Sequence, residues 1–555
     1  MKSMIIRSAI AGCVVLSASS ALARRCNNNH KAPKNVIVMI PDGCDETVQT
    51  VARWYKGSDL EMDNMVPGTV KVHMANSVIP GSAAAATAFA TGHKTTARFL
   101  GVGPRTEDLL TGFKPTAAPY APVASILEAA KRAGKSVGIV ATSRVTHATP
   151  AAFACHIHDR GKDNEIMEHM VYNNVDVVFG GGARHLIPAG ETYTTSFGAT
   201  WGGKRSDGEN LMDVLTERGY EFIDSKEQLD HISGTKVWGL FDDSHMQPDM
   251  DRQYFAEHEP SLAEMVEKAI EILSKNPKGF LLMVEGSQVD WAGHNNDPIY
   301  MVTDFLAFDN AVAVANDFAK EQGNTTVLAY PDHNTGGMKI GHYNTAVGYT
   351  ETTIEDLVDV LKGMTMSANG VVAKMADGSD EALVASVLEN WGIELTETDV
   401  EEIRNYGASL SYSLAYVVSK NHTVIGWTTH GHTGETVPVW MYGCDAPGRV
   451  IDNTELATMA ADAIGVNLKT TTRQYFMDLD KIKTNYEIDY ADPENPVVKL
   501  GSFSLPISKD YMVHKCGKTF PLPSVTVLAT QATDDLEDDK VYISRWAALM
   551  IRWFN

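Results

Sequence analysis

Residues 36–43, with the sequence VIVMIPDG, place five apolar residues directly before a proline, Asp42 and a glycine. An uninterrupted apolar run of this length is typical of a strand buried on both faces of a parallel sheet. The same pattern recurs along the chain: residues 280–284 precede Glu285, residues 326–330 precede Asp332, and residues 137–141 lead to Thr149. Because ligand sites of such sheets lie beyond the carboxyl ends of the strands, we expect these oxygen-bearing side chains to share one edge.

Amphipathic stretches separate these runs, at residues 122–133, 262–273, 301–319 and 454–464. Buried strands that alternate with helices predict an α/β fold, here a three-layer αβα sandwich with a central, mostly parallel sheet. We assign the core of this fold to residues 34–353 and 421–465.

Three segments depart from the alternation. Residues 184–252 are rich in Gly, Asp and Thr and predict loops over the sheet edge. Residues 354–420 carry several helical patterns in succession and predict a helical insert. Residues 466–555 predict a C-terminal accessory region that is rich in short β-strands. Its last stretch contains Trp546, Leu549, Ile551 and Trp553, for which packing or a subunit contact is a better explanation than a membrane anchor.

The first 23 residues have the pattern of a secretory signal peptide. Lys2 and Arg7 precede a short apolar stretch, and Ala21 and Ala23 are small residues suited to cleavage after Ala23. A lipoprotein box ending at Cys13 is the weaker alternative, because almost no apolar run precedes it. No later segment has the length and apolar content of a membrane span. We therefore expect a periplasmic or extracellular protein.

Composition excludes some classes of function. The 555 residues carry a net charge of -23, so binding to nucleic-acid backbones is not expected. Removal of the signal leaves Cys26, Cys44, Cys155, Cys444 and Cys516, without a Cys-x-x-Cys pair. Zinc sites built from cysteine are therefore not expected, and any disulfide pairing stays open.

The carboxylates at the strand ends are accompanied by histidines. Carboxylates that gather together repel one another unless they are protonated or bridged by a cation. Asp290 and His294 are four residues apart and can share a metal ion if the turn is helical. His333 adjoins Asp332, and residues 430–435 read HGHTGE. Mixed imidazole and carboxylate ligands suit zinc, whereas sites built from oxygen suit magnesium, so the inventory suggests two zinc-type sites and one magnesium-type site.

A serine in residues 80–92, PGSAAAATAFATG, is the candidate nucleophile. Pro80 and Gly81 allow a turn, and the alanines that follow predict a helix with Ser82 at its N-terminus. Free backbone N–H groups at such an end favour an anion. A serine that only caps the helix is the simpler interpretation of this motif taken alone.

Six motifs in order resemble those of the alkaline phosphatase family. They are the Asp-Gly after the first strand, SAAAATAFATG, ATPA, VEGSQVDWAGH, Asp-His and His-Thr-Gly, and the resemblance covers residues 34–349 and 424–465. It implies a secreted phosphomonoesterase that acts through a phosphoserine intermediate, with two Zn²⁺ and one Mg²⁺. It also implies small phosphate monoesters as substrates and a possible homodimer.

The resemblance assigns a role to each matching position. The first zinc takes Asp290, His294 and His432; the second takes Asp42, Asp332 and His333 together with the Ser82 oxygen; magnesium takes Asp42, Thr149 and Glu285. Arg160 falls where the family has its phosphate-binding arginine, whose guanidinium can hold two phosphate oxygens.

Two features depart from the common family pattern. His147 and Trp291 stand beside the metal positions, where some relatives carry Asp and Lys, and the pair resembles a subset of bacterial enzymes. His147 is suited to bind a water of the third site or, in excess zinc, to coordinate that metal itself. Gly81 replaces an aspartate that commonly precedes the nucleophile and steers the arginine, which suggests that Arg160 holds phosphate less tightly here.

Other functions on the same scaffold are less well supported. A sulfatase needs Cys or Ser followed by x-Pro-x-Arg, which Ser82 lacks. A phosphodiesterase would need room for a second substituent where Arg160 grips the phosphate. A non-catalytic phosphate- or metal-binding homologue would have lost ligands, whereas every expected position is filled.

Overall fold

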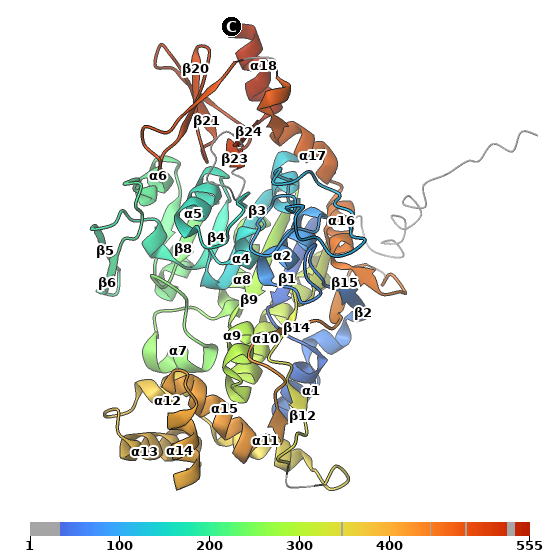
Figure 1. The fold of residues 1–555 in the computed structure, drawn as a ribbon, viewed down its shortest axis with the longest axis vertical. Coiled ribbons are helices and arrows are strands. Elements are labelled where there is room, and N and C mark those ends of the chain that lie inside the picture. Colours follow the sequence, from blue (N-terminus) through green and yellow to red (C-terminus); the bar gives the residue numbers. More distant parts are fainter. Residues whose placement is uncertain (1–33, 346–347, 445, 483–484, 530–538, 555) are drawn as a thin grey trace, which may run out of the picture.

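The computed structural model describes residues 34–554 except 346–347, 445, 483–484 and 530–538. The predicted signal peptide, the alternative lipoprotein box at Cys13 and Cys26 lie outside the described residues. Figure 1 shows an elongated molecule with a central sheet, a helical group at one end of the long axis and a β-rich region at the other.

A ten-stranded sheet forms the centre of the molecule, in the order β16-β2-β15-β10-β1-β9-β3-β4-β8-β7. Only β15 runs antiparallel to both of its neighbours among these strands. The predicted α/β fold with a mostly parallel sheet is confirmed. The strands are β1 (Asn35–Pro41), β2 (Val66–Lys71), β3 (Ser136–Arg144), β4 (Val177–Gly181), β7 (Glu221–Ile223), β8 (Val237–Leu240), β9 (Phe280–Gly286), β10 (Thr325–Ala329), β15 (Val437–Tyr442) and β16 (Ile451–Asp452).

The two faces of the sheet are covered by separate hydrophobic clusters. Along β1, Val36, Val38 and Ile40 belong to one cluster, whereas Ile37 and Met39 belong to the other, as the alternation of side chains along a strand requires. Each face therefore has its own layer of helices. The first cluster contains α2 (Ser82–Thr91), α3 (Ile126–Arg132), α4 (Ala148–Ala151), α5 (Asp163–Tyr172), α6 (Leu211–Glu217) and α16 (Asn453–Ile464); the second contains α1 (Glu46–Lys56), α8 (Leu262–Leu273), α9 (Gln288–Asn295) and α10 (Pro298–Gln322).

The four strands that carry the predicted ligands are consecutive in the sheet, in the order β10, β1, β9, β3. Their register aligns Glu285 of β9 with Ile40 of β1 on one side and with Ala141 of β3 on the other. Because all four strands run in the same direction, their carboxyl ends meet at one edge.

Residues 184–252 are more regular than the sequence indicates. Within them, β7 and β8 extend the central sheet as parallel strands, and α6 lies between β4 and β7 along the chain. The prediction of loops alone was wrong here. The two strands have three and four residues, which is too short for an apolar pattern to be distinguished from a loop.

Five helices follow β12 (Lys339–Ile340) along the chain. Each of α11 to α14 begins behind a Ser or Thr whose hydroxyl accepts a backbone N–H, which satisfies the free helix end. Their apolar faces join the second cluster and thereby attach the group to the core. The helices are α11 (Ile354–Gly363), α12 (Ala368–Ala373), α13 (Asp380–Trp391), α14 (Glu397–Asn405) and α15 (Leu410–His422). We refer to residues 354–422 as the helical insert.

The C-terminal region has a small hydrophobic cluster of its own. It contains a five-stranded antiparallel sheet, β18-β19-β20-β21-β22, a three-stranded sheet, β17-β24-β23, and two helices. The elements are α17 (Leu468–Tyr475), β17 (Met477–Asp478), β18 (Glu487–Asp489), β19 (Val497–Leu500), β20 (Phe503–Pro506), β21 (Tyr511–His514), β22 (Thr519–Pro521), β23 (Val527–Ala529), β24 (Lys540–Ile543) and α18 (Arg545–Phe554).

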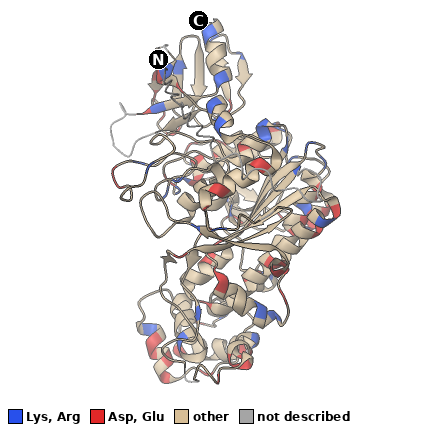
Figure 2. Ribbon diagram, turned by 90° about the vertical axis from the view of Figure 1, so that its right-hand side faces the viewer, with Lys and Arg blue, Asp and Glu red and all other residues tan. Residues whose placement is uncertain are grey.

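The four apolar residues noted in α18 divide between two faces of the helix. Ala547 and Ile551 pack into the local cluster, whereas Trp546, Leu549 and Trp553 are exposed. Helices α17 and α18 carry Lys and Arg but no carboxylate, in contrast to the acidic α13 and α14 at the opposite end (Figure 2). None of the helices in the described ranges has the length and apolar character needed to cross a membrane.

An ion-pair network joins the C-terminal region to the core. Lys509 lies 3.1 Å from Glu168 and 2.7 Å from Glu209, and the buried Arg205 contacts Asp207. The three carboxylates are close enough together to hold a metal ion. Because two cationic side chains already pair with them, we interpret the group as a structural network.

Candidate active site

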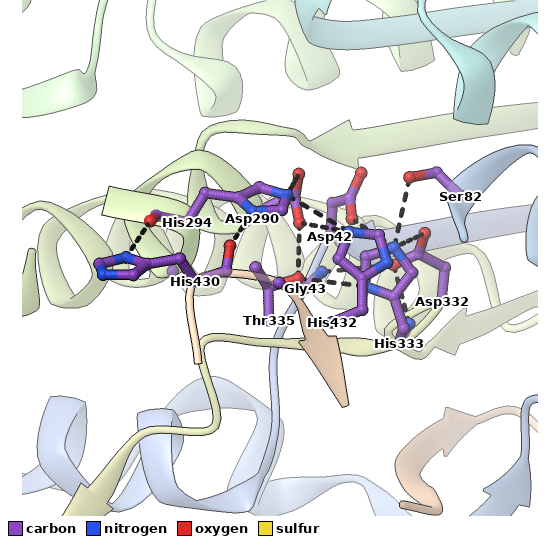
Figure 3. Close-up of polar contacts among 12 residues, drawn as sticks. Asp42, Gly43, Ser82, Asp290, His294, Asp332, His333, Thr335, His430 and His432 are labelled. Atoms are coloured by element: carbon purple, nitrogen blue, oxygen red, sulfur yellow. Dashed lines mark hydrogen bonds and ion pairs between the residues drawn. The ribbon is translucent and has the colours of Figure 1, made fainter. Parts of the chain in front are cut away.

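The predicted metal ligands meet at one edge of the sheet, beyond the ends of β10, β1, β9 and β3. Figure 3 shows those predicted for the two zinc ions. Asp42, Glu285, Asp332 and His333 have no exposed surface. At this edge, three groups of side chains have ligand atoms within 4.8 Å of one another: Asp290, His294 and His432; Asp42, Asp332 and His333; and Asp42, His147 and Glu285. Asp42 belongs to two of these groups and therefore joins them.

The first group combines a helix with a distant strand. Asp290 and His294 lie one turn apart on α9, with the His294 Nε2 atom 3.5 Å from Asp290 Oδ2. His432 begins β14 (His432–Thr433), which pairs with β11 (Asn334–Thr335) so that His432 is opposite Thr335. This pairing brings His432 Nε2 to 3.7 Å from Asp290 Oδ1.

The second group lies beside the candidate nucleophile. The His333 Nε2 atom is 3.0 Å from Asp332 Oδ2, 3.6 Å from Asp42 Oδ1 and 3.3 Å from the hydroxyl of Ser82. The turn that follows Asp42 requires a glycine, because Gly43 has a φ of 71° and a Cβ there would lie 2.7 Å from Thr335 Oγ1.

The third group contains His147, which the sequence placed beside the third metal position, either binding a water there or, in excess zinc, coordinating the metal itself. Thr149 Oγ1 lies 3.5 Å from Asp42 Oδ2, and Ser143 donates to Glu285 at 3.4 Å. His147 lies within reach of the same two carboxylates. Trp291 packs its ring edge-on against His147, with ring centroids 5.6 Å apart, and against His245 at 4.3 Å.

Hydrogen bonds fix the tautomers of the two histidines in the first group. His294 Nδ1 donates to the carbonyl of His430 at 2.6 Å, and His432 Nδ1 donates to the carbonyl of Pro80 at 2.8 Å. A carbonyl can only accept, so in each neutral ring the lone pair is on Nε2. The two Nε2 atoms face each other at 3.3 Å. Two lone pairs at this separation repel unless a cation or a proton lies between them.

The neutral ring of His333 has the same tautomer, with its proton on Nδ1. Thr335 donates its hydroxyl proton to Asp290 at 2.6 Å, so it can only accept from His333 Nδ1 at 3.2 Å. The lone pair of His333 Nε2 is thereby directed at the carboxylates of Asp42 and Asp332. In all three imidazoles of the first two groups, one ring nitrogen donates a hydrogen bond and the other directs its lone pair toward carboxylate oxygens. Metal-binding histidines are oriented in this way, by a hydrogen bond from the nitrogen that does not bind the metal.

Unsatisfied oxygens of the buried carboxylates also indicate that the site requires positive charge. Asp42 Oδ1, Asp332 Oδ2 and Glu285 Oε1 are buried and have no hydrogen-bond partner among the described residues. Burial, followed by the charge of Asp332, raises the pKa of Asp42 well above its usual value. Burial also raises the pKa of Glu285 to about 7. The donor set therefore fits bound metal ions, which would satisfy these oxygens and allow both groups to ionise.

Comparisons with known proteins identify the family. The family model described as alkaline phosphatase matches residues 33–466. Alkaline phosphatase 3 of Bacillus subtilis is 32% identical over 465 residues, which cover 80% of this chain and 91% of that protein. The repressible alkaline phosphatase of Saccharomyces cerevisiae is 30% identical over 540 residues, covering 86% of this chain and 90% of that protein. Among solved structures, Thermus thermophilus alkaline phosphatase has a TM-score of 0.68 at 25% identity, covering 79% of this chain and 92% of that one.

The chain belongs to the alkaline phosphatase family. It is therefore a metal-binding hydrolase of phosphoric monoesters. The family match runs through the helical insert, which the sequence motifs left unmatched, and ends at residue 466, so most of the C-terminal region lies outside it.

The serine of this alkaline phosphatase is not a capping residue. Gly81 occupies the N-cap position of α2 and Ser82 is the first helical residue, without a side-chain cap hydrogen bond. The simpler interpretation of the motif is thus wrong. The buried hydroxyl of Ser82 is directed at His333 instead (Figure 3).

Arg160 contacts the third group through His147. Its Nη2 donates to His147 Nε2 at 2.7 Å, and its backbone N–H donates to the carbonyl of Arg98. Burial, followed by the charge of Arg160, lowers the pKa of His147 well below its usual value. His147 is therefore neutral, and its Nε2 accepts from the guanidinium.

Sequence reasoning missed two residues of the site. Thr335 bridges Asp290 and His333, and His430 supports His294. Thr335 follows the Asp332-His333 pair by two residues, which would have made it a candidate. His430 stands two residues before a predicted ligand, but nothing in the sequence distinguishes its role from that of His432.

Replacing Glu285 with glutamine tests the electrostatic requirement in metal-free protein. A carboxylate whose folded-state pKa is raised binds more protons when folded, so its contribution to stability falls as pH rises from about 4.5 through about 7. Glutamine does not ionise. Metal-free Glu285→Gln should therefore gain stability over metal-free wild type across this range, by about 3 kcal/mol at its upper end.

Denaturant unfolding at pH 5 and pH 8 measures this difference. A constant stability difference between the two proteins would contradict the argument. With zinc and magnesium present, the order should reverse, because the wild-type carboxylate then binds a cation.

Proposed function

We propose that this alkaline phosphatase hydrolyses phosphate monoesters through a phosphoserine on Ser82, at a site that holds two Zn²⁺ and one Mg²⁺. The observation that supports it best is the hydroxyl of Ser82 at 3.3 Å from His333 Nε2, beside two ligand groups joined through Asp42. Phosphoryl transfer depends on positioning and charge neutralisation, which this cluster is built to provide.

The proposed reaction has two displacements at phosphorus. Ser82 Oγ forms a bond to phosphorus while the bond to the alcohol oxygen breaks, and the alcohol leaves. Water then attacks the phosphoserine, releasing inorganic phosphate and the free serine. The metal ions would supply positive charge that favours the ionised serine and the departing oxygen. Asp290, His294 and His432 would hold the first zinc; Asp42, Asp332 and His333 the second; and Asp42, Thr149 and Glu285 the magnesium.

Arg160 is proposed to orient the transferred group. Its guanidinium is placed close enough to Asp42 and Asp290 for their charges to act on it. In this proposal it releases His147 and donates two hydrogen bonds to phosphate oxygens when substrate binds. The hydrogen bond to His147 gives it a defined resting partner.

Replacing Ser82 with alanine removes the proposed nucleophile without touching a charged ligand. Turnover of p-nitrophenyl phosphate should fall by a factor of at least about 10³ while zinc content remains that of the wild type. Trapping of phosphate on the protein at low pH should be lost with it. The proposal fails if turnover persists, or if a phosphorylated residue other than Ser82 is found. Activity on the bis ester above that on the monoester would favour a phosphodiesterase.

Metal removal tests the proposed ions. Purified protein should contain two zinc ions and one magnesium ion per chain, and chelation should abolish activity that zinc with magnesium then restores. His147 offers the third group a nitrogen, which favours zinc there when zinc is in excess. His147→Asp should therefore bind magnesium more tightly than the wild type. Activity that survives complete chelation would refute the metal assignment.

Replacing Gly81 with aspartate tests how Arg160 is held. Gly81 has an extended backbone, and a Cβ at this position would meet no atom within 4 Å, so neither the backbone nor the added Cβ opposes the substitution. A carboxylate there should orient Arg160 and tighten inhibition by inorganic phosphate by about threefold or more, with slower product release. Gly81→Asn is the matched control, because it adds similar bulk without charge. Equal inhibition constants for the two variants would contradict the idea.

Export is the remaining part of the proposal. The N-terminal pattern supports cleavage after Ala23, so protein recovered from the periplasm or medium should begin at Arg24. Retention of the first 23 residues on exported protein would contradict it. The homodimer that the resemblance implies is tested by light scattering of the same material.

A further inference from the structure

His430 ties a proposed zinc ligand to a neighbouring loop. His294 Nδ1 donates to the carbonyl of His430 at 2.6 Å, and His430 Nδ1 donates to the carbonyl of His294 at 2.9 Å. Asn296 adds a bond to the carbonyl of Thr429 at 3.0 Å. The end of α9 and the segment before β14 are thus held together by three hydrogen bonds, although His430 itself belongs to none of the three ligand groups.

The other ring nitrogen of His430 contacts the helical insert. Because Nδ1 donates to a carbonyl, the neutral ring carries its lone pair on Nε2. Tyr406, the C-cap residue that follows α14, places its hydroxyl 2.5 Å from that nitrogen and must be the donor. Burial and the neighbouring Tyr416 raise the pKa of Tyr406, so the hydroxyl keeps its proton. The rings of Tyr412 and Tyr416 pack against His430 at 4.4 and 5.4 Å.

His294 is the ligand that most needs such support. Its side chain is 33% exposed, compared with 18% for His432 and 5% for Asp290. It also stands in the last turn of α9, which ends at Asn295. Helix ends have unsatisfied carbonyls and lose their order first, so the orientation of this imidazole depends on contacts from outside the helix.

We propose that Tyr406 is a positioning residue through which the helical insert fixes His294 for zinc. The proposal rests on the proposed function of His294 as a zinc ligand. The chain of contacts is Tyr406 hydroxyl to His430 ring, and His430 ring and carbonyl to His294. Partners that orient a ligand imidazole raise metal affinity, and their loss typically weakens binding by about 10- to 100-fold.

Replacing Tyr406 with phenylalanine removes the hydroxyl and keeps the ring. Tyr412→Phe is the matched control, since Tyr412 packs on the same imidazole and its hydroxyl makes no hydrogen bond among the described residues. Metal-free proteins are reconstituted with zinc and then competed with a chelator. In Tyr406→Phe, one zinc equivalent should be lost about tenfold more readily while the second is retained as in the wild type. Tyr412→Phe should retain both.

A double substitution separates positioning from simple loosening of the insert. Asparagine in place of His430 keeps a donor for the carbonyl of His294 but is too short to reach Tyr406. If the contact acts through the imidazole, Tyr406→Phe should weaken zinc binding in the wild-type background and have no further effect in His430→Asn. Equal effects of Tyr406→Phe in both backgrounds, or equal zinc loss in Tyr406→Phe and Tyr412→Phe, would overturn the proposal.

Wild-type protein distinguishes this inference from the proposed function. If the wild type binds two zinc equivalents and Tyr406→Phe behaves as Tyr412→Phe does, only the role of Tyr406 is refuted. If the wild type does not bind two equivalents, the zinc assignment itself is wrong, and the role of Tyr406 falls with it.

Discussion

Repulsion among four buried carboxylates at the carboxyl edge of the sheet is the constraint on which the site depends. Two unit charges 4 Å apart interact by about 4 kcal/mol at an effective dielectric constant of 20, and more where water is excluded. Asp42 has such neighbours on two sides, from β9 and from the segment after β10. This environment raises the pKa values of Asp42 and Glu285, so cations among the carboxylates are needed to keep these two groups ionised, and metal binding is coupled to the geometry of the edge.

The backbone at this edge is held by forces that do not involve the site. Side chains of β1 alternate between two hydrophobic clusters, so that a shift of the strand by one residue would exchange its two faces. The register with β9 and β10 is therefore strongly specified, and with it the positions of Asp42 and Glu285. Hydrophobic burial across the whole sheet thus supplies the rigidity against which a repulsive cluster can be maintained.

Local patterns were sufficient to predict much of the site. Asp42 and Glu285 follow apolar strands, and the spacing of Asp290 and His294 matches one helical turn, so sequence alone identified them. Pairings across long stretches of chain leave no such pattern. His432 reaches Asp290 only because β14 pairs with β11, about a hundred residues earlier, and its place was inferred from the family resemblance. The contact of Arg160 with His147 and the tyrosines around His430 likewise depend on tertiary packing.

The same reasoning explains why β7 and β8 were not predicted. Three or four residues in a strand bury too little apolar surface to show a period, and their position follows from the neighbouring β4, to which β8 pairs. The fold class was accessible because it depends on many long runs at once. Edge strands, by contrast, are defined by the sheet that they join.

Exposure differs between the two zinc-type groups, and the difference has a chemical consequence. Asp42, Asp332 and His333 have no exposed surface, whereas His294 and His432 are partly exposed. In the proposed reaction the alcohol leaves and water arrives on the side opposite the serine. A buried group beside Ser82 and a more accessible group on the solvent side fit a reaction in which the alcohol leaves toward solvent and water enters from it. The accessible group lacks the rigidity that burial gives, which is why ligands there need hydrogen-bonded partners such as His430 to hold their orientation.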